Sequence, residues 1–239
     1  MEKREMAQGV EKHPYFEASA IVEQSEPGTR DMGELYPFLI SGGQNTERFY
    51  FTHINDTTGY KFNIKPKYFC DESNYTEAFP KRIREVLRNN NDAKIYCVFD
   101  WDTIYGDESK KKKHAQFEEQ FKEEIAKGIL TICPSMPSIE YWFLLHFVND
   151  KTLRLTCGKV IEVLAPYMNA YFPHKTKTLG KVIKAEKYLK DSSWVENLCA
   201  DGKLELAIAR AEKNIEAALA AGNLESQSYS FVYKVFKRQ

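Results

Sequence analysis

The chain has 239 residues, of which 43% are hydrophobic and 28% charged, and Lys plus Arg equal Asp plus Glu at 34 each. This composition supplies a core and excludes a disordered chain, and the zero net charge excludes a bulk electrostatic attraction to nucleic acid. No run of about 18 apolar residues exists, and five scattered cysteines without a C-x-x-C pair argue against a disulfide framework and a zinc site. We expect a cytoplasmic protein with no membrane segment and no secretory signal.

The predicted elements begin after a polar stretch. Residues 1–34 lack periodicity and contain a Pro-Gly pair, so we predict a flexible N-terminal arm. Within 35–150, strand-like and helix-like patterns alternate. Their order is strand 36–40, helix 46–55, strand 60–64, helix 76–88, strand 94–99, helix 114–127, strand 129–133 and a helix from 138 to 147. This alternation predicts an α/β core with a mostly parallel sheet flanked by helices.

The remaining residues, 151–239, predict a helical portion packed on that core, with helices near 158–170, 178–190 and 203–221. This portion is basic: it contains 15 Lys and Arg against 9 Asp and Glu, whereas residues 1–150 contain 19 against 25. A basic surface of this kind could contact nucleic acid, although ordinary scatter of charges explains the asymmetry equally well.

Polar residues follow three of the predicted strands at the point where each ends. In chain order they are Gly42, Gly43, Glu47, Asp100, Asp102, Ser138 and Glu140. Ligands of open α/β sheets bind beyond the carboxyl ends of the strands, so these residues form one candidate site. Paired carboxylates repel each other unless a cation neutralises them, and oxygen ligands without His or Cys suit Mg²⁺ or Mn²⁺. A helix cap or a solvent-facing pair is the alternative for the two aspartates.

Glycine and lysine residues add candidate contacts for phosphate groups. Gly42 and Gly43 leave an open turn before a helix, where backbone N–H groups can meet a phosphate. Lys110–Lys113 is predicted as a loop of four cations beside the same edge of the sheet. Lys177, Lys181 and Lys184 share one face of a predicted helix by their i, i+4, i+7 spacing. A solvated helix face explains these lysines equally well.

Three segments of the sequence resemble the RloB-like protein family. Residues 38–51, FLISGGQNTERFYF, resemble its opening E-G-x-x-T-E-x-x-Y-F, and Val98–Asp102 resembles its F-D-x-D. Residues 137–147, PSIEYWFLLHF, are similar to its P-x-x-E-x-W-L-L-L-H-F. The resemblance extends over roughly residues 36–236. It implies a Toprim-like fold, related to OLD-type nucleases, in which acids after the strands hold a divalent metal for phosphodiester chemistry.

The family motifs carry over residue by residue, with one departure. Asp100 and Asp102 match the D-x-D, Ser138 and Glu140 match the S-x-E, and Glu47 matches the second opening acid. Gly42 stands where the family has its first acid. The lysine that follows the S-x-E in OLD nucleases would correspond to one of two residues, Lys175 or Lys177.

The resemblance therefore implies a metal-dependent nuclease acting on DNA or RNA in bacterial phage defence. The alternative is a catalytically degenerate module that binds nucleic acid or regulates a partner protein of a defence system. A homodimer is compatible with either function. A phosphatase of the haloacid-dehalogenase type, with Asp100 as nucleophile and Asp102 as acid, fits less well because Ile104 replaces the usual hydroxyl.

Overall fold

The computed structural model describes residues 36–42, 46–65, 78–90, 93–172, 178–185 and 190–237. The predicted N-terminal arm, Gly43, Lys175 and Lys177 lie outside the described residues.

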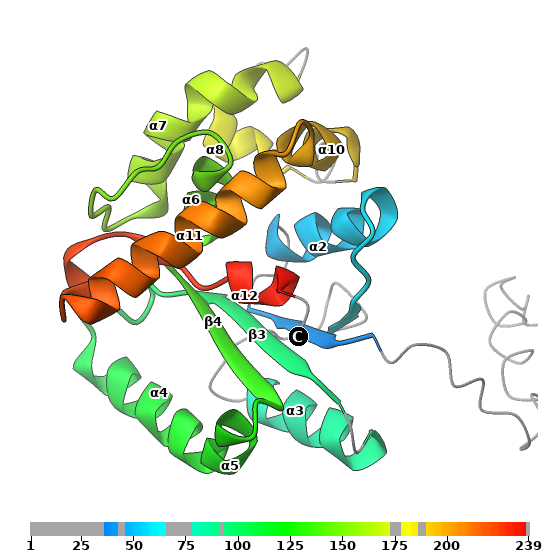
Figure 1. Ribbon diagram of the computed structural model, residues 1–239, viewed down its shortest axis with the longest axis vertical. Helices are drawn as coiled ribbons and strands as arrows, with labels where there is room; N and C mark the ends of the chain where they lie inside the picture. The colour runs from blue at the N-terminus through cyan, green and yellow to red at the C-terminus, as the bar shows by residue number, and fades with distance from the viewer. Residues whose placement is uncertain are drawn as a thin grey trace, which may run out of the picture. The chain divides into compact units, whose positions relative to one another are not determined.

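A five-stranded sheet in the order β2-β1-β3-β4-β5 forms the centre of the fold (Figure 1). The strands are β1 (Phe38–Ser41), β2 (Asn63–Lys65), β3 (Ile95–Asp100), β4 (Leu130–Met136) and β5 (Tyr229–Ser230). The first four run parallel, and β5 pairs antiparallel with β4. The predicted α/β class is therefore confirmed. The strand β5 lies in a portion for which only helices were predicted, because two residues give no readable period.

Helices cover both faces of this sheet (Figure 1). One face packs against α3 (Ala78–Asn89), α4 (Glu108–Gln120) and α5 (Lys122–Ala126). The other face carries α2 (Thr46–Thr57), α6 (Ile139–Leu145), α7 (Cys157–Met168), α8 (Leu179–Val182), α10 (Ser193–Cys199), α11 (Lys203–Ala220) and α12 (Tyr233–Phe236). Short 3₁₀ turns follow α7 and α11 at Asn169–Tyr171 and Leu224–Ser226. Adjacent strand residues such as Leu39 and Ile40 enter opposite cores, as the two-residue period of a strand requires.

The helix α6 runs through the larger core. Every residue from Ile139 to Leu145 is buried, as its continuous apolar sequence predicted. The indole N–H of Trp142 donates to the Tyr50 hydroxyl at 2.8 Å, so the polar atom of this fully buried ring has a partner. Among the described helices, none is both long and apolar enough to cross a membrane.

The prediction of a lysine loop at 110–113 is wrong, because these residues belong to α4. The helix begins six residues before the predicted start at 114. The Asp107 side chain caps it by accepting from the Lys110 N–H at 3.0 Å. Lys111 pairs with Glu108 at 3.0 Å across one turn, which offsets part of the repulsion among the four lysines.

Two other predicted elements are shorter in the structure. The predicted strand 60–64 is reduced to β2, because the Asn55 side chain bonds both the N–H and the carbonyl of Phe62 and holds that residue against α2. Within the predicted helix 178–190, of which residues 186–189 lie outside the described residues, α8 ends at Val182. Ile183 then is fully buried, and its carbonyl accepts from the Thr46 hydroxyl at 3.5 Å. Of the three lysines predicted to share a helical face, Lys181 lies in α8, Lys184 lies beyond its end, and Lys177 is outside the described residues.

Candidate active site

Backbone hydrogen bonds join the end of β3 to the turn between β4 and α6. Asp100 pairs with Ser135 in the register of the sheet. One residue later, the Trp101 N–H donates to the Ser135 carbonyl at 2.8 Å. The Asp102 N–H then donates to the Pro137 carbonyl at 3.0 Å. The D-x-D segment therefore lies alongside the start of the S-x-E segment, as the argument from strand ends predicted.

The Asp100 carboxylate caps α6. Its Oδ1 accepts from the N–H of Ile139, the first residue of the helix, at 2.9 Å. The first N–H groups of a helix have no partner within the helix, so Asp100 satisfies one of them. Ser138 occupies the N-cap position, but its hydroxyl instead donates to Glu140 Oε2 at 2.6 Å. Both residues are at most 2% exposed, so the Glu140 carboxylate is fixed by a buried partner.

Glu47 is buried in the first turn of α2, where it is only 5% exposed. Burial raises the pKa of Glu47 from 4.5 to about 7. The Glu140 and Asp102 carboxylates contribute to this increase, while the backbone N–H of Glu47 and the Lys184 ammonium oppose it. Glu47 thus interacts electrostatically with acids from two other segments of the chain.

The pKa values of Asp100 and Asp102 are raised by the same buried, acidic surroundings. Burial raises the pKa of Asp100 well above its usual range, and the charges of Glu47, Glu140 and Asp102 raise it further. Burial and Glu140 also raise the pKa of Asp102, against the backbone N–H groups of Thr103 and Cys157 and the charge of Lys184. Four carboxylates therefore share one electrostatic environment at the carboxyl edge of the sheet. We call Glu47, Asp100, Asp102 and Glu140 the acidic cluster.

The chemistry of the acidic cluster fits a hard divalent cation. Its donors are carboxylate oxygens with one hydroxyl nearby, the ligand type that Mg²⁺ and Mn²⁺ prefer, and a cation would relieve the repulsion that raises these pKa values. Among the described residues, no group of three or more His, Cys, Asp or Glu side chains is arranged to hold a metal ion as it stands. Ion binding would therefore require the carboxylates to turn toward one point.

Lys184 is the described lysine whose charge acts on the acidic cluster at both Glu47 and Asp102. It is exposed, and it follows Ile183, whose carbonyl is bonded to Thr46 at the start of α2. This bond places the Lys184 backbone one residue from a contact with the helix that carries Glu47. Lys181, one helical turn earlier, is exposed on α8.

Cys157, the first residue of α7, also lies near the acidic cluster, and no motif in the sequence points to it. Its backbone N–H acts on the pKa of Asp102, and the side chains of Ser138 and Glu140 act on the pKa of its thiol, so Cys157 lies close to all three residues. Burial and the Glu140 charge raise the pKa of this thiol to about 12, so it is protonated at neutral pH. The available signal was Thr156, which caps α7 by accepting from the Lys159 N–H and so predicts a helix N-terminus at 157.

A comparison with protein-family models matches residues 38–238 to the model described as RloB-like protein. The chain belongs to the RloB-like protein family. No curated protein and no solved structure matches the chain.

The structure of this RloB-like protein explains why Gly42 cannot be exchanged freely for an acid. A Cβ atom at Gly42 would lie 2.8 Å from Phe99 Cβ and 3.3 Å from the Val98 carbonyl oxygen. The Gly42 N–H already donates to that carbonyl at 2.7 Å. The predicted approach of a phosphate to this turn therefore rests on Gly43, which lies outside the described residues.

The lysines of α4 begin beside the turn that carries Asp102. The Lys110 ammonium donates to the Thr103 carbonyl at 2.8 Å, and Lys112 and Lys113 are exposed further along the helix. In this RloB-like chain the helix α4 thus starts next to the acidic cluster and leads away from it on the opposite face of the sheet from α6 (Figure 1).

Proposed function

We propose that this RloB-like protein is a Mg²⁺- or Mn²⁺-dependent nuclease that hydrolyses phosphodiester bonds of DNA or RNA in bacterial defence against phage. The observation that supports the proposal most strongly is the acidic cluster. It gathers four carboxylates from α2, the end of β3 and the start of α6, and burial together with their mutual charges raises the pKa values of Glu47, Asp100 and Asp102. Such a cluster has a cost for folding that a bound cation would remove.

In this proposal Asp100, Asp102 and Glu140 hold the cation, and Glu47 is a further ligand or the base. A bound divalent cation polarises phosphoryl oxygens and lowers the pKa of water. Ser138 keeps the Glu140 carboxylate oriented through its 2.6 Å hydrogen bond. Lys175 or Lys177 would stabilise the charge that develops on the phosphate, and Lys184, whose charge acts on Glu47 and Asp102, is a further candidate for this role.

The nucleic acid would lie along the lysines that flank the acidic cluster. Lys110–Lys113 on α4, with Lys181 and Lys184 at α8, provide exposed or half-exposed ammonium groups from both sides of the sheet edge. Contacts of this kind bind phosphates without reading the sequence of bases, so we propose a weak sequence preference. The partner could be DNA or RNA on this basis.

One observation favours a second function, a non-catalytic module that binds nucleic acid or a defence partner. The site lacks the first acid of the family motif, and Phe99 leaves no room for a side chain at Gly42 without a shift of the neighbouring strand. If that acid is indispensable for turnover, the chain retains binding surfaces without hydrolysis.

A cleavage assay separates these functions. The parent protein, Asp102→Ala and the control Asp56→Ala are incubated with plasmid DNA, tRNA and bulk RNA in Mg²⁺, in Mn²⁺ and in EDTA. Asp56 is exposed on α2, away from the acidic cluster, so it makes the same chemical change without touching the site. A nuclease loses about 100-fold or more of its rate in Asp102→Ala alone. Tight binding without cleavage by the parent in either metal would instead support the non-catalytic module.

A further inference from the structure

The first turn of α7 packs against α6 and begins beside two carboxylates of the acidic cluster. The backbone N–H of Cys157, the first residue of α7, acts electrostatically on Asp102, and its thiol interacts with the side chains of Ser138 and Glu140. This N–H is one of the groups at a helix N-terminus that find no partner inside the helix. A shift of this turn would change the surroundings of Asp102 and Glu140 together.

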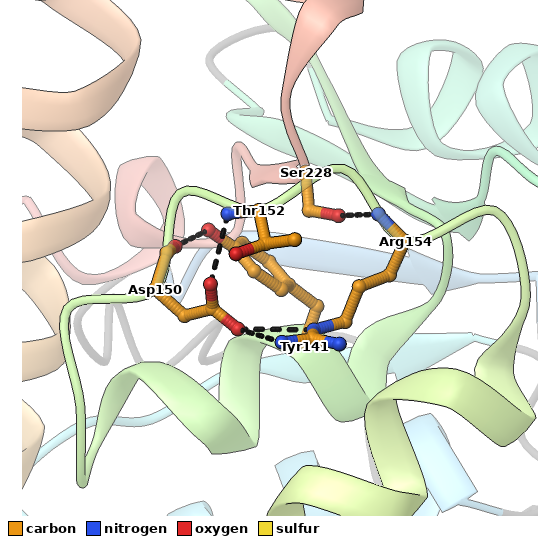
Figure 2. A network of polar contacts seen from close by, with 5 residues as sticks. All are labelled: Tyr141, Asp150, Thr152, Arg154 and Ser228. Atoms are coloured by element: carbon orange, nitrogen blue, oxygen red, sulfur yellow. Dashed lines mark hydrogen bonds and ion pairs between the residues drawn. The ribbon is translucent and has the colours of Figure 1, made fainter.

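A network of polar contacts holds the segment that leads into this turn (Figure 2). The Arg154 guanidinium donates twice to Asp150 Oδ2, from Nε at 2.9 Å and from Nη2 at 2.6 Å. The other oxygen of Asp150, Oδ1, accepts from the Thr152 N–H at 2.8 Å. The Arg154 N–H donates to the Ser228 hydroxyl at 2.8 Å, just before β5. Both charged side chains are less than one-fifth exposed, so their ion pair is shielded from water.

The same network also contacts α6. The Tyr141 hydroxyl donates to the Asp150 carbonyl, and Tyr141 directly follows Glu140 in the helix (Figure 2). Residues 149–155 lie in no helix or strand, so the Asp150–Arg154 pair does not brace a helix turn. It instead joins the start of α6, the entry to α7 and the β5 segment at one point.

We propose that Arg154 and Asp150 are positioning residues of the site: their ion pair fixes the first turn of α7 against α6, and thereby orients Asp102 and Glu140 toward a divalent cation. This inference rests on the proposed metal-dependent function. Neither residue touches the acidic cluster in the contacts described above, and both act through Cys157 and Tyr141. Residues that orient metal ligands without binding the metal themselves commonly change metal affinity by about 10- to 100-fold when they are removed.

The test measures Mn²⁺ affinity by electron paramagnetic resonance, and urea unfolding on the same samples, for the full chain and its variants. Arg154→Gln removes the ion pair, and Arg154→Lys keeps the charge but loses the double contact with Asp150. Arg210→Gln is the matched control, because Arg210 is also partly buried but donates to the Leu145 carbonyl at the opposite end of α6, at 2.7 Å. All affinities are measured in the absence of urea, where each variant is shown to be folded.

We expect Mn²⁺ binding to weaken about ten-fold or more in Arg154→Gln, to be partly restored in Arg154→Lys, and to stay at the parental value in Arg210→Gln. A folded Arg154→Gln protein with parental affinity would overturn the inference, whatever its stability. If Arg154→Gln does not fold, the double variant Tyr141→Phe with Ser228→Ala replaces it, and parental affinity there overturns the inference as well. Absence of Mn²⁺ binding by the parent would overturn the proposed function together with this inference, which keeps the two failures distinguishable.

Discussion

The glycine at the end of β1 is required by the closeness of two strands. Its φ angle does not lie among the positive values found at Gly106, Gly128, Gly202 and Gly222. The obstacle to a side chain is Phe99 on the neighbouring strand β3, whose Cβ lies 2.8 Å from an ideal Cβ at Gly42. An acid at this position would have to push β1 away from β3, and this would disturb Asp100 at the end of the same strand.

We predict that Gly42→Ala lowers the free energy of unfolding by about 1–3 kcal/mol, the usual cost of overpacking a core. Gly59→Ala is the control, because nothing lies within 4 Å of a Cβ there and its stability should match the parent within about 0.5 kcal/mol. Urea unfolding of the three proteins gives the comparison. Gly42→Glu should be at least as unstable as Gly42→Ala and gain no Mn²⁺ affinity. Equal stability of the Gly42 and Gly59 variants would contradict this account of the strand spacing.

Glu47 makes the stability of the metal-free protein depend on pH. Its folded pKa of about 7 exceeds its ordinary value of 4.5, so the folded state holds a proton that the unfolded state releases first. The free energy of unfolding should therefore fall as pH rises from about 4.5 to about 7. Asp100 and Asp102, whose pKa values are also raised, act in the same direction.

We predict that Glu47→Gln removes part of this fall in the free energy of unfolding with rising pH. In EDTA at pH 8 the variant should be more stable than the parent by on the order of 1–3 kcal/mol, and at pH 4 the difference should vanish. Urea unfolding of the parent and the variant at several pH values measures the difference at pH 8 and at pH 4. Glu162→Gln, on the exposed side of α7, is the control and should follow the parental curve. A constant difference at all pH values would indicate a packing effect in place of a charge effect.

At the scale of elements, the sequence predicts best where a long period or a strand end carries the signal. The burial of α6 and the meeting of the D-x-D and S-x-E segments were predictable, because apolar runs and parallel strand ends dictate them. The extent of α4 was not, since four successive lysines resemble a loop until the Asp107 cap and the acidic neighbours of the lysines are considered. The length of α8 depends on Ile183 entering the core, which no local pattern indicates.

Some residues of the candidate site could likewise be predicted from the sequence and others could not. Its carboxylates could be selected from the sequence because each follows a strand or opens a helix. Cys157 and the Asp150–Arg154 pair could not, because their relation to the acidic cluster arises from a segment without regular structure that folds back between α6 and α7. The electrostatic effect of Lys184 on the acids likewise depends on the packing of residue 183 against α2.

At the scale of the whole described chain, the C-terminal segment completes both the sheet and the larger core. β5 pairs with β4, and the ring of Phe236 stacks on Trp142 with centroids 5.6 Å apart. The same ring lies 6.3 Å from Phe51 of α2 and 5.0 Å from Tyr60. Phe236 thus joins residues that are far apart in the sequence.

We predict that Phe236→Ala lowers the free energy of unfolding by about 3–5 kcal/mol, the usual cost of removing a buried aromatic ring. Phe231→Ala is the matched control, since Phe231 is only partly buried and packs at the margin of the core. The free energy of unfolding should fall clearly less in Phe231→Ala than in Phe236→Ala. Thermal and urea unfolding both report the difference, and a Phe236 variant as stable as the Phe231 variant would refute the central role of this ring.

The ribosome makes β5 long after its partner β4, and this order has a consequence for biosynthesis. The hydroxyls of Ser135 and Ser230 meet at 2.7 Å although 95 positions separate them. While the ribosome makes the intervening residues, β4 remains the outermost strand, with unpaired backbone groups that another nascent chain could join. Slow pairing between distant segments lengthens this exposure. This edge therefore stays open until α6, α7 and α11 have been made and β5 emerges.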